Sequence, residues 1–155
     1  MKLAVDTNIF GYAAGIGDDD AKRIRAGWLL KSIPPYRLVM PSQVAGELYN
    51  LLCRKGGQKP KIATKIVLDW VDALTFAPQG PGTMREALQT ASFQNLQIWD
   101  ALIINTASEA GCSVLLSEDL QNGFICRGVT VVNPFAETLH PLLASVINGM
   151  PGPNT

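Results

Sequence analysis

The feature that most constrains this fold is the alternation of short apolar runs with longer segments of helical pattern. The runs "KLAV", "YRLVM", "CSVLLS" and "VTVVNPF" have the length of strands and are followed by residues typical of turns. Between them lie segments with apolar residues at helical spacing, such as 18–33, 41–57 and 98–111. Strands that alternate with helices favour a parallel sheet, so we predict an α/β fold with a central, mainly parallel β-sheet flanked by α-helices.

The length and composition fit one domain. With 155 residues, 47% of them hydrophobic, the chain can bury a single core. Its 13 basic residues balance its 13 acidic ones, so an anionic partner must be held by a local patch rather than by net charge. We expect residues 1–137 to form the domain and residues 138–155 to be an extension of undetermined role that ends in a disordered tail.

The cysteines and the N-terminal segment predict a cellular location. Cys53, Cys112 and Cys126 are odd in number and lack C-x-x-C spacing, which is typical of reduced cytosolic thiols. The start "MKLAVD" leaves no room for the apolar core of a signal peptide, and no later run approaches membrane-spanning length. We therefore expect a cytoplasmic protein with no membrane segment.

Four acidic residues do not fit the pattern of ordinary surface charge. Asp6 follows the first strand and Asp119 closes the run "SVLLSED". Glu47 lies between apolar neighbours on a helix, and Asp100 precedes "ALII". The carboxyl ends of parallel strands form one rim, so Asp6 and Asp119 are expected to share it, with the two helical acids directed into it. Four such carboxylates repel unless a cation neutralises them, and Mg²⁺ or Mn²⁺ prefers oxygen ligands and supports phosphodiester cleavage.

Each of these acids also has a purely structural explanation. Asp6 and Asp100 are both placed to cap a helix, a role that Asp often takes. Glu47 can extend to solvent, and Asp119 can hold a turn. Glu118 precedes Asp119, and alternation along a strand sends the two side chains in opposite directions. Which of the two faces a site is left open.

Four motifs, in this order and with these flanks, resemble those of the PIN-domain ribonucleases, especially the VapC-like toxins of type II toxin-antitoxin pairs. "LAVDTNIF" is similar to the first strand and first acid of the family, and "PSQVAGELYNLLCRK" to the helix that carries its second acid. "IWDALIINTASEAGC" is similar to the helix of the third acid, and "SVLLSEDLQNG" to the turn of the fourth. The similarity runs from residue 1 to about residue 135.

This resemblance implies a metal-dependent endoribonuclease, the toxin of a pair with a cognate antitoxin, and a homodimer. It implies that Mg²⁺ or Mn²⁺ is bound, and water activated against an RNA phosphodiester, by an acidic quartet of Asp6, Glu47, Asp100 and Asp119. It also implies that Asn8 and Ser117 help to orient the site. Thr7 either supports the site or only packs and caps.

Five bases and no acid occur in the segment 54–65: Arg54, Lys55, Lys59, Lys61 and Lys65. Such a run is also typical of a solvated turn between helices. A polyanionic substrate beside an acidic site needs local positive surface, so we predict that this run contacts RNA. Trp28, Trp70 and Trp99 are interpreted as core residues rather than as platforms for stacked bases.

Other chemistries fit less well, and two rival functions stay open. His140 is the single histidine, which excludes a two-histidine ribonuclease and argues against a Ser-His-Asp centre. The segment "GGQKP" lacks the spacing of a phosphate-binding loop. One rival is a non-catalytic RNA- or partner-binding module on the same scaffold, against which the intact quartet argues. The other is a structure-specific DNA nuclease, to which the same acids point equally.

Overall fold

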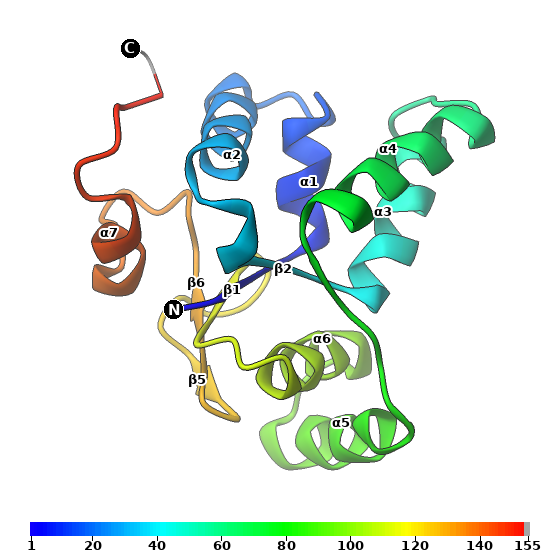
Figure 1. Ribbon diagram of the computed structural model, residues 1–155. Coiled ribbons are helices and arrows are strands. Elements are labelled where there is room, and N and C mark those ends of the chain that lie inside the picture. Colours follow the sequence, from blue (N-terminus) through cyan, green and yellow to red (C-terminus); the bar gives the residue numbers. More distant parts are fainter. Residues whose placement is uncertain (154–155) are drawn as a thin grey trace.

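The computed structural model describes residues 1–153, and a β-sheet forms its centre (Figure 1). The strands of this sheet are β1 (Leu3–Val5), β2 (Leu38–Pro41), β3 (Thr75–Ala77), β4 (Val114–Leu116), β5 (Ile125–Cys126) and β6 (Val129–Val132). Their order across the sheet is β3-β2-β1-β4-β6-β5. All neighbours are parallel except β5, which forms an antiparallel hairpin with β6. The predicted α/β fold with a mainly parallel sheet is confirmed.

Helices cover both faces of the sheet. They are α1 (Thr7–Ala13), α2 (Asp20–Ser32), α3 (Ser42–Arg54), α4 (Pro60–Ala73), α5 (Pro81–Gln94), α6 (Ile98–Glu109) and α7 (Pro141–Ile147), with a short 3₁₀ helix at Pro35–Arg37. In Figure 1, α5 and α6 pack together on one side of the sheet and α1 and α2 on the other. The parallel crossovers explain this arrangement, because each helix returns the chain over a face of the sheet.

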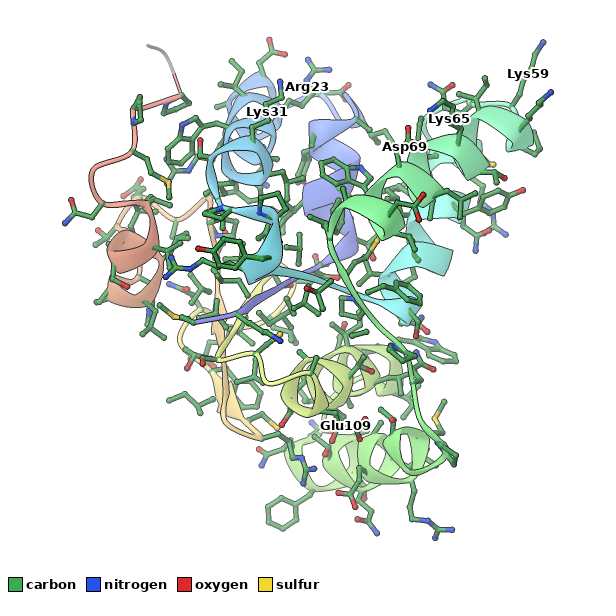
Figure 2. All side chains as sticks on the ribbon, viewed as in Figure 1. Arg23, Lys31, Lys59, Lys65, Asp69 and Glu109 are labelled. Atoms are coloured by element: carbon green, nitrogen blue, oxygen red, sulfur yellow. The ribbon has the colours of Figure 1, made fainter. Side chains whose placement is uncertain are left out.

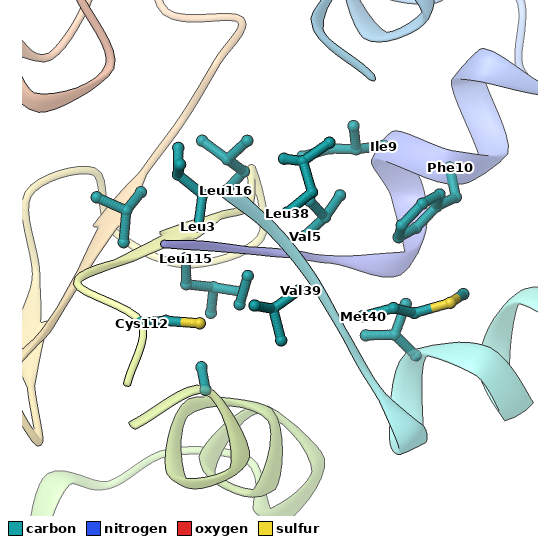
Figure 3. Packing of buried hydrophobic residues seen from close by; sticks show 14 of the residues in the cluster. Leu3, Val5, Ile9, Phe10, Leu38, Val39, Met40, Cys112, Leu115 and Leu116 are labelled. Atoms are coloured by element: carbon teal, nitrogen blue, oxygen red, sulfur yellow. The ribbon is translucent and has the colours of Figure 1, made fainter. Parts of the chain in front are cut away.

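The core follows from the alternation of side chains along the strands. In Figure 3, Leu38 and Leu116 point toward the side of α1, and Val39, Leu115 and Cys112 point toward α6. The four aliphatic side chains are almost completely buried. Because both faces of the sheet are covered, the strands read as continuous apolar runs rather than as alternating patterns.

Four elements were not predicted from the sequence, one of them the 3₁₀ helix at Pro35–Arg37. Strands β3 and β5 have three and two residues, too few to leave a pattern. Helix α7 lies in the predicted extension and buries Leu143 and Val146. Beyond it, the carbonyl of Pro151 accepts a hydrogen bond of 2.7 Å from the indole N–H of Trp28 on α2. Residues 154–155, the end of the tail that we expect to be disordered, lie outside the described residues, and the limit at residue 137 stays a prediction.

The strand order fixes where a ligand can bind. Strand β1 pairs with β2 on one side and with β4 on the other, so the direction in which the chain adds strands reverses there. In parallel sheets such a reversal opens a crevice at the carboxyl ends of the strands. Asp6 follows β1 directly and lies at this crevice. In the part of the chain that the structure describes, no helix is both long and apolar enough to cross a membrane.

Candidate active site

A cavity of about 540 Å³ opens at the carboxyl ends of the central strands, and the four predicted acids line it. Asp6 follows β1, Glu47 lies in the second turn of α3 after β2, and Asp119 follows β4. Helix α6 runs antiparallel to the strands, so its first turn, which carries Asp100, reaches the same end of the sheet. Four carboxylates from separate elements thus surround one opening.

Asp6 is held by two hydrogen bonds and is almost completely buried. Its Oδ1 accepts from the backbone N–H of Thr7 at 2.7 Å, and its Oδ2 accepts from the hydroxyl of Ser117 at 2.6 Å. Asp6 is therefore the N-cap of α1 as well as part of the cavity wall. Burial raises the pKa of Asp6 to about 6, and the charges of Asp119 and Glu47 act in the same direction against the two hydrogen bonds.

Glu47 is turned into the cavity wall rather than out to solvent. Its Oε2 accepts a hydrogen bond of 2.6 Å from the Thr7 hydroxyl, and its Oε1 accepts one of 2.8 Å from Nε2 of Gln43. Thr7 thus contacts two of the four acids, Asp6 through its backbone and Glu47 through its side chain. These bonds fix the rotamer of a side chain that would otherwise be mobile on the helix surface.

Asp100 does not cap a helix. Helix α6 begins after Gln97, which occupies the N-cap position, and no side chain forms a capping hydrogen bond there. Asp100 is instead the third helical residue, half-buried beside the cavity. Burial raises its pKa, and the charges of Asp119 and Glu47 raise it further. The capping explanation is wrong for Asp100, whereas Asp6 combines capping with a place in the cavity.

The turn after β4 answers the question left open for Glu118 and Asp119. Asp119 faces the cavity, where its Oδ2 accepts a hydrogen bond of 3.0 Å from Nδ2 of Asn8. Its backbone N–H donates to the hydroxyl of Ser117 at 3.2 Å. Partial burial, together with the charges of Glu118 and Glu47, raises the pKa of Asp119. Asn8 and Ser117 therefore contact two acids of the cavity.

Glu118 points away from the cavity into a group that we call the Glu118 cluster: Tyr12, Lys22, Glu118 and Phe135. The Tyr12 hydroxyl donates to Oε1 of Glu118, and the Lys22 ammonium donates to Oε2, each at 2.5 Å. The ammonium also lies 5.4 Å from the centroid of the Tyr12 ring and 5.5 Å from that of Phe135. Attraction of the ammonium to the quadrupoles of both rings adds to the ion pair. Glu118 thus has its charge balanced locally.

Two basic side chains of the run 54–65 reach the cavity. Arg54 and Lys55, at the end of α3, belong to its lining. The lysines at positions 59, 61 and 65 do not line it; Figure 2 shows Lys59 and Lys65 along α4, where the Lys65 ammonium lies 2.8 Å from a carboxylate oxygen of Asp69. A contact of these three lysines with RNA stays a prediction.

Sequence reasoning missed one aromatic residue of the cavity. Trp99 is 52% exposed and lines the opening, so its interpretation as a core residue is wrong. Trp28 and Trp70, in contrast, pack against the core as expected. The segment around Trp99 gave no signal, because α6 is buried over its whole length from Ala101 to Ala107 and has no polar face to orient its first turn.

The chemistry of the donor set fits a hard divalent cation. Carboxylate, amide and hydroxyl oxygens surround the cavity, and each bonded carboxylate oxygen keeps a second lone pair. Within residues 1–153, however, no three His, Cys, Asp or Glu side chains form a group that could hold a metal ion as they stand. An ion held by three of these carboxylates would draw them closer together than they lie in this structure.

The family model described as "PIN domain" matches residues 3–123. No curated protein sequence is significantly similar to the chain.

Several solved structures share the fold. The toxin VapC20 of Mycobacterium tuberculosis, described as cleaving the sarcin-ricin loop, is 20% identical with a TM-score of 0.64, covering 76% of this chain and 92% of its own. A toxin-antitoxin complex from Klebsiella pneumoniae is 18% identical with a TM-score of 0.64, covering 87% and 98%. VapBC2 from Rickettsia felis, bound to a promoter DNA fragment, is 16% identical with a TM-score of 0.58, covering 84% and 97%.

Proposed function

The chain belongs to the PIN domain family, and on this premise we propose that it is a metal-dependent endoribonuclease and the toxin of a toxin-antitoxin pair. The observation that carries this proposal is the cavity lined by Asp6, Glu47, Asp100 and Asp119 at the carboxyl ends of the strands. Burial raises the pKa values of the three aspartates, and the charges of neighbouring acids in the cavity raise them further. Perturbed carboxylates in a cleft are typical of a reactive site.

The residues of the cavity have different roles in phosphodiester hydrolysis. The four carboxylates would hold Mg²⁺ or Mn²⁺, which supplies Lewis acidity that lowers the pKa of water and offsets phosphate charge. Asn8 and Ser117 hold the carboxylates of Asp119 and Asp6 in place through their hydrogen bonds. Arg54 and Lys55 supply positive charge to the phosphates on either side of the scissile bond. No side chain has to form a covalent bond with the substrate.

The intact acidic set favours an enzyme over a non-catalytic binding module, because a module that only binds has no use for four mutually repelling carboxylates. The choice of RNA over DNA rests on the likeness of the fold to VapC20, which is described as cleaving the sarcin-ricin loop. A DNA nuclease with the same acids is the alternative that the experiment must separate.

The test is cleavage of matched single-stranded RNA and DNA by the purified protein with Mn²⁺, with Mg²⁺ and with EDTA. We expect cleavage of RNA only, its loss in EDTA and its return when metal is added back. Cleavage that survives exhaustive chelation would overturn the metal dependence, and preferential cleavage of DNA would overturn the substrate. Binding of RNA without cleavage under every metal condition would favour the non-catalytic module.

An antitoxin partner and a homodimer are part of the same proposal. Toxin-antitoxin complexes occur among the structures that share the fold. We expect a small DNA-binding protein encoded beside this chain to form a complex with it and to suppress RNA cleavage. Light scattering on the isolated chain tests the homodimer, and cytoplasmic location is tested by cell fractionation.

A further inference from the structure

Trp99 differs from the other two tryptophans in what its ring contacts. The Trp70 ring packs edge-on against Phe10, with the ring centroids 5.2 Å apart. The indole N–H of Trp28 donates to the carbonyl of Pro151 at 2.7 Å. Across residues 1–153 the Trp99 ring has no aromatic partner and its N–H no acceptor. More than half of this large apolar residue meets solvent, so the ring is accessible to a ligand in the cavity.

The exposed ring lies in the same cavity as the carboxylates. Trp99 and Asp100 are consecutive in the first turn of α6, so this turn brings an aromatic ring and an acid to the opening together. The end of α3 contributes Arg54 and Lys55 to the lining of the cavity. A ligand that enters therefore meets an aromatic ring, positive charge and the acidic centre within one cavity.

We propose that Trp99 forms a base-binding subsite, on which an unpaired nucleobase of a single-stranded polynucleotide stacks while its flanking phosphates lie toward Arg54 and Lys55. A nucleobase offers a flat π-face that covers the indole, and its phosphates complement the two cations. In a duplex the base faces are already covered by stacking, so such a subsite selects single strands. The inference rests on the proposed nuclease function only in taking this cavity as the substrate site.

Equilibrium binding in EDTA tests the subsite without hydrolysis. The probes are a short uridine RNA, the matching deoxyuridine DNA and an abasic chain with the same number of phosphates. Quenching of tryptophan fluorescence and the dissociation constant are measured for the parent, Trp99→Phe and Trp99→Ala. We expect Trp99→Ala to weaken binding of the base-bearing chains roughly tenfold, with Trp99→Phe in between, since stacking on an aromatic ring contributes an effect of that order. Affinity for the abasic chain should be unchanged.

The matched control is Phe93→Ala on α5. Phe93 is 88% exposed and lines a different cavity, so its loss should leave all three dissociation constants as they are. Equal weakening of the base-bearing and abasic chains by Trp99→Ala would overturn the subsite, as would no weakening at all. An effect confined to RNA would also overturn it, because stacking does not involve the 2′-hydroxyl.

The subsite and the proposed function can fail separately. Suppose that Trp99→Ala weakens binding of base-bearing chains but not of the abasic chain, and that the protein cleaves no RNA with any metal. This result would overturn the nuclease and support the subsite. RNA cleavage with the same KM and the same dissociation constants in parent and Trp99→Ala would support the nuclease and overturn the subsite.

Discussion

The turn after β4 holds carboxylates in two different electrostatic environments, one on each side. On the cavity side, Asp119 faces Asp6 and Asp100, and all three have raised pKa values. On the other side, Glu118 accepts hydrogen bonds from Tyr12 and Lys22, and the ammonium balances its charge. A balanced carboxylate is a structural contact, whereas unbalanced ones attract a cation. One turn thus separates two neighbouring acids into Glu118, whose charge is balanced by Lys22, and Asp119, which faces two other acids.

Catalysis should show the largest difference between the two sides. Asp119→Asn should lower kcat on RNA by roughly 100-fold or more, because it removes a charged oxygen from the acidic set and misplaces the reacting groups. Glu118→Gln keeps the shape of the structural contact and should lower kcat far less. Asp69→Asn, a surface change on α4, serves as the control. If kcat falls equally in the three variants, Asp119 has no catalytic role that Glu118 lacks.

The buried carboxyl of Asp6 extends the comparison to the dependence of stability on pH. Its pKa is raised to about 6 from 3.8, so between these values the folded protein holds a proton that the unfolded chain releases. This proton contributes about 3 kcal/mol to the free energy of unfolding. The contribution is fully present below pH 3.8 and is lost as the pH rises through 6. Urea denaturation in EDTA across this range measures it.

Asp6→Asn should flatten this pH dependence, because Asn keeps the cap of α1 and carries no titrating group. The raised pKa values of Asp100 and Asp119 act in the same direction, so part of the slope should remain. If the free energy of unfolding of the metal-free protein rises with pH over this range, the aspartates of the cavity do not have raised pKa values.

Metal binding should stabilise the cavity side in particular. Mn²⁺ at 100 times its dissociation constant should add about 2.7 kcal/mol to the free energy of unfolding of the parent. Asp100→Ala should gain much less. Because Asp100 caps no helix, the variant should melt in EDTA at the temperature of the parent or above it. Equal shifts by Mn²⁺ in parent and variant, with a clear loss in EDTA, would make Asp100 a structural residue.

The Glu118 cluster should show the opposite behaviour, with an effect on stability but little on metal binding. Lys22→Met leaves the half-buried carboxylate of Glu118 without its cation and should cost on the order of 1–3 kcal/mol. Adding Glu118→Gln should recover part of this loss, because the charge is then gone. Lys31→Met, near the end of the same helix in Figure 2, is the control. If the losses of Lys22→Met and Glu118→Gln simply add in the double variant, the pair contributes nothing as a pair.

The smallest effect concerns the basic side chains of the run 54–65. Arg54→Gln and Lys55→Gln should each reduce the slope of log affinity against log salt by roughly 0.7 on single-stranded RNA, because each loses a phosphate contact. Lys65→Gln should change the slope less, since Lys65 pairs with Asp69 and does not line the cavity. Equal changes would extend the RNA surface to the whole run 54–65, as predicted from the sequence.

The strands and the longer helices could be predicted because local pattern determines them. Apolar runs of strand length and helical spacing are properties of neighbouring residues, and they led to β1, β2, β4 and β6. The meeting of Asp6 and Asp119 at one rim followed from parallel topology alone. The orientation of Glu118 could not be predicted in the same way, because it depends on an ammonium 96 residues earlier in the chain.

Trp99 and the short elements were beyond prediction for a different reason. In a helix that is buried from Ala101 to Ala107, no periodicity shows which residue of the first turn meets solvent. Strands of two or three residues are stabilised by their neighbours in the sheet rather than by their own sequence. Prediction therefore succeeded where local pattern or the parallel topology decides a property, and failed where contacts with particular distant residues decide it.

The bond between Ser117 and Asp6, which joins residues 111 positions apart, has a consequence for synthesis of the protein. A chain leaving the ribosome carries Asp6, Glu47 and Asp100 early, but strand β4 must emerge before Ser117 and Asp119 can complete the acidic set. Strand β1 can pair with β2 early, but its second partner, β4, is translated near the end of the domain. The cavity with its four acids therefore cannot form until most of the chain has been made.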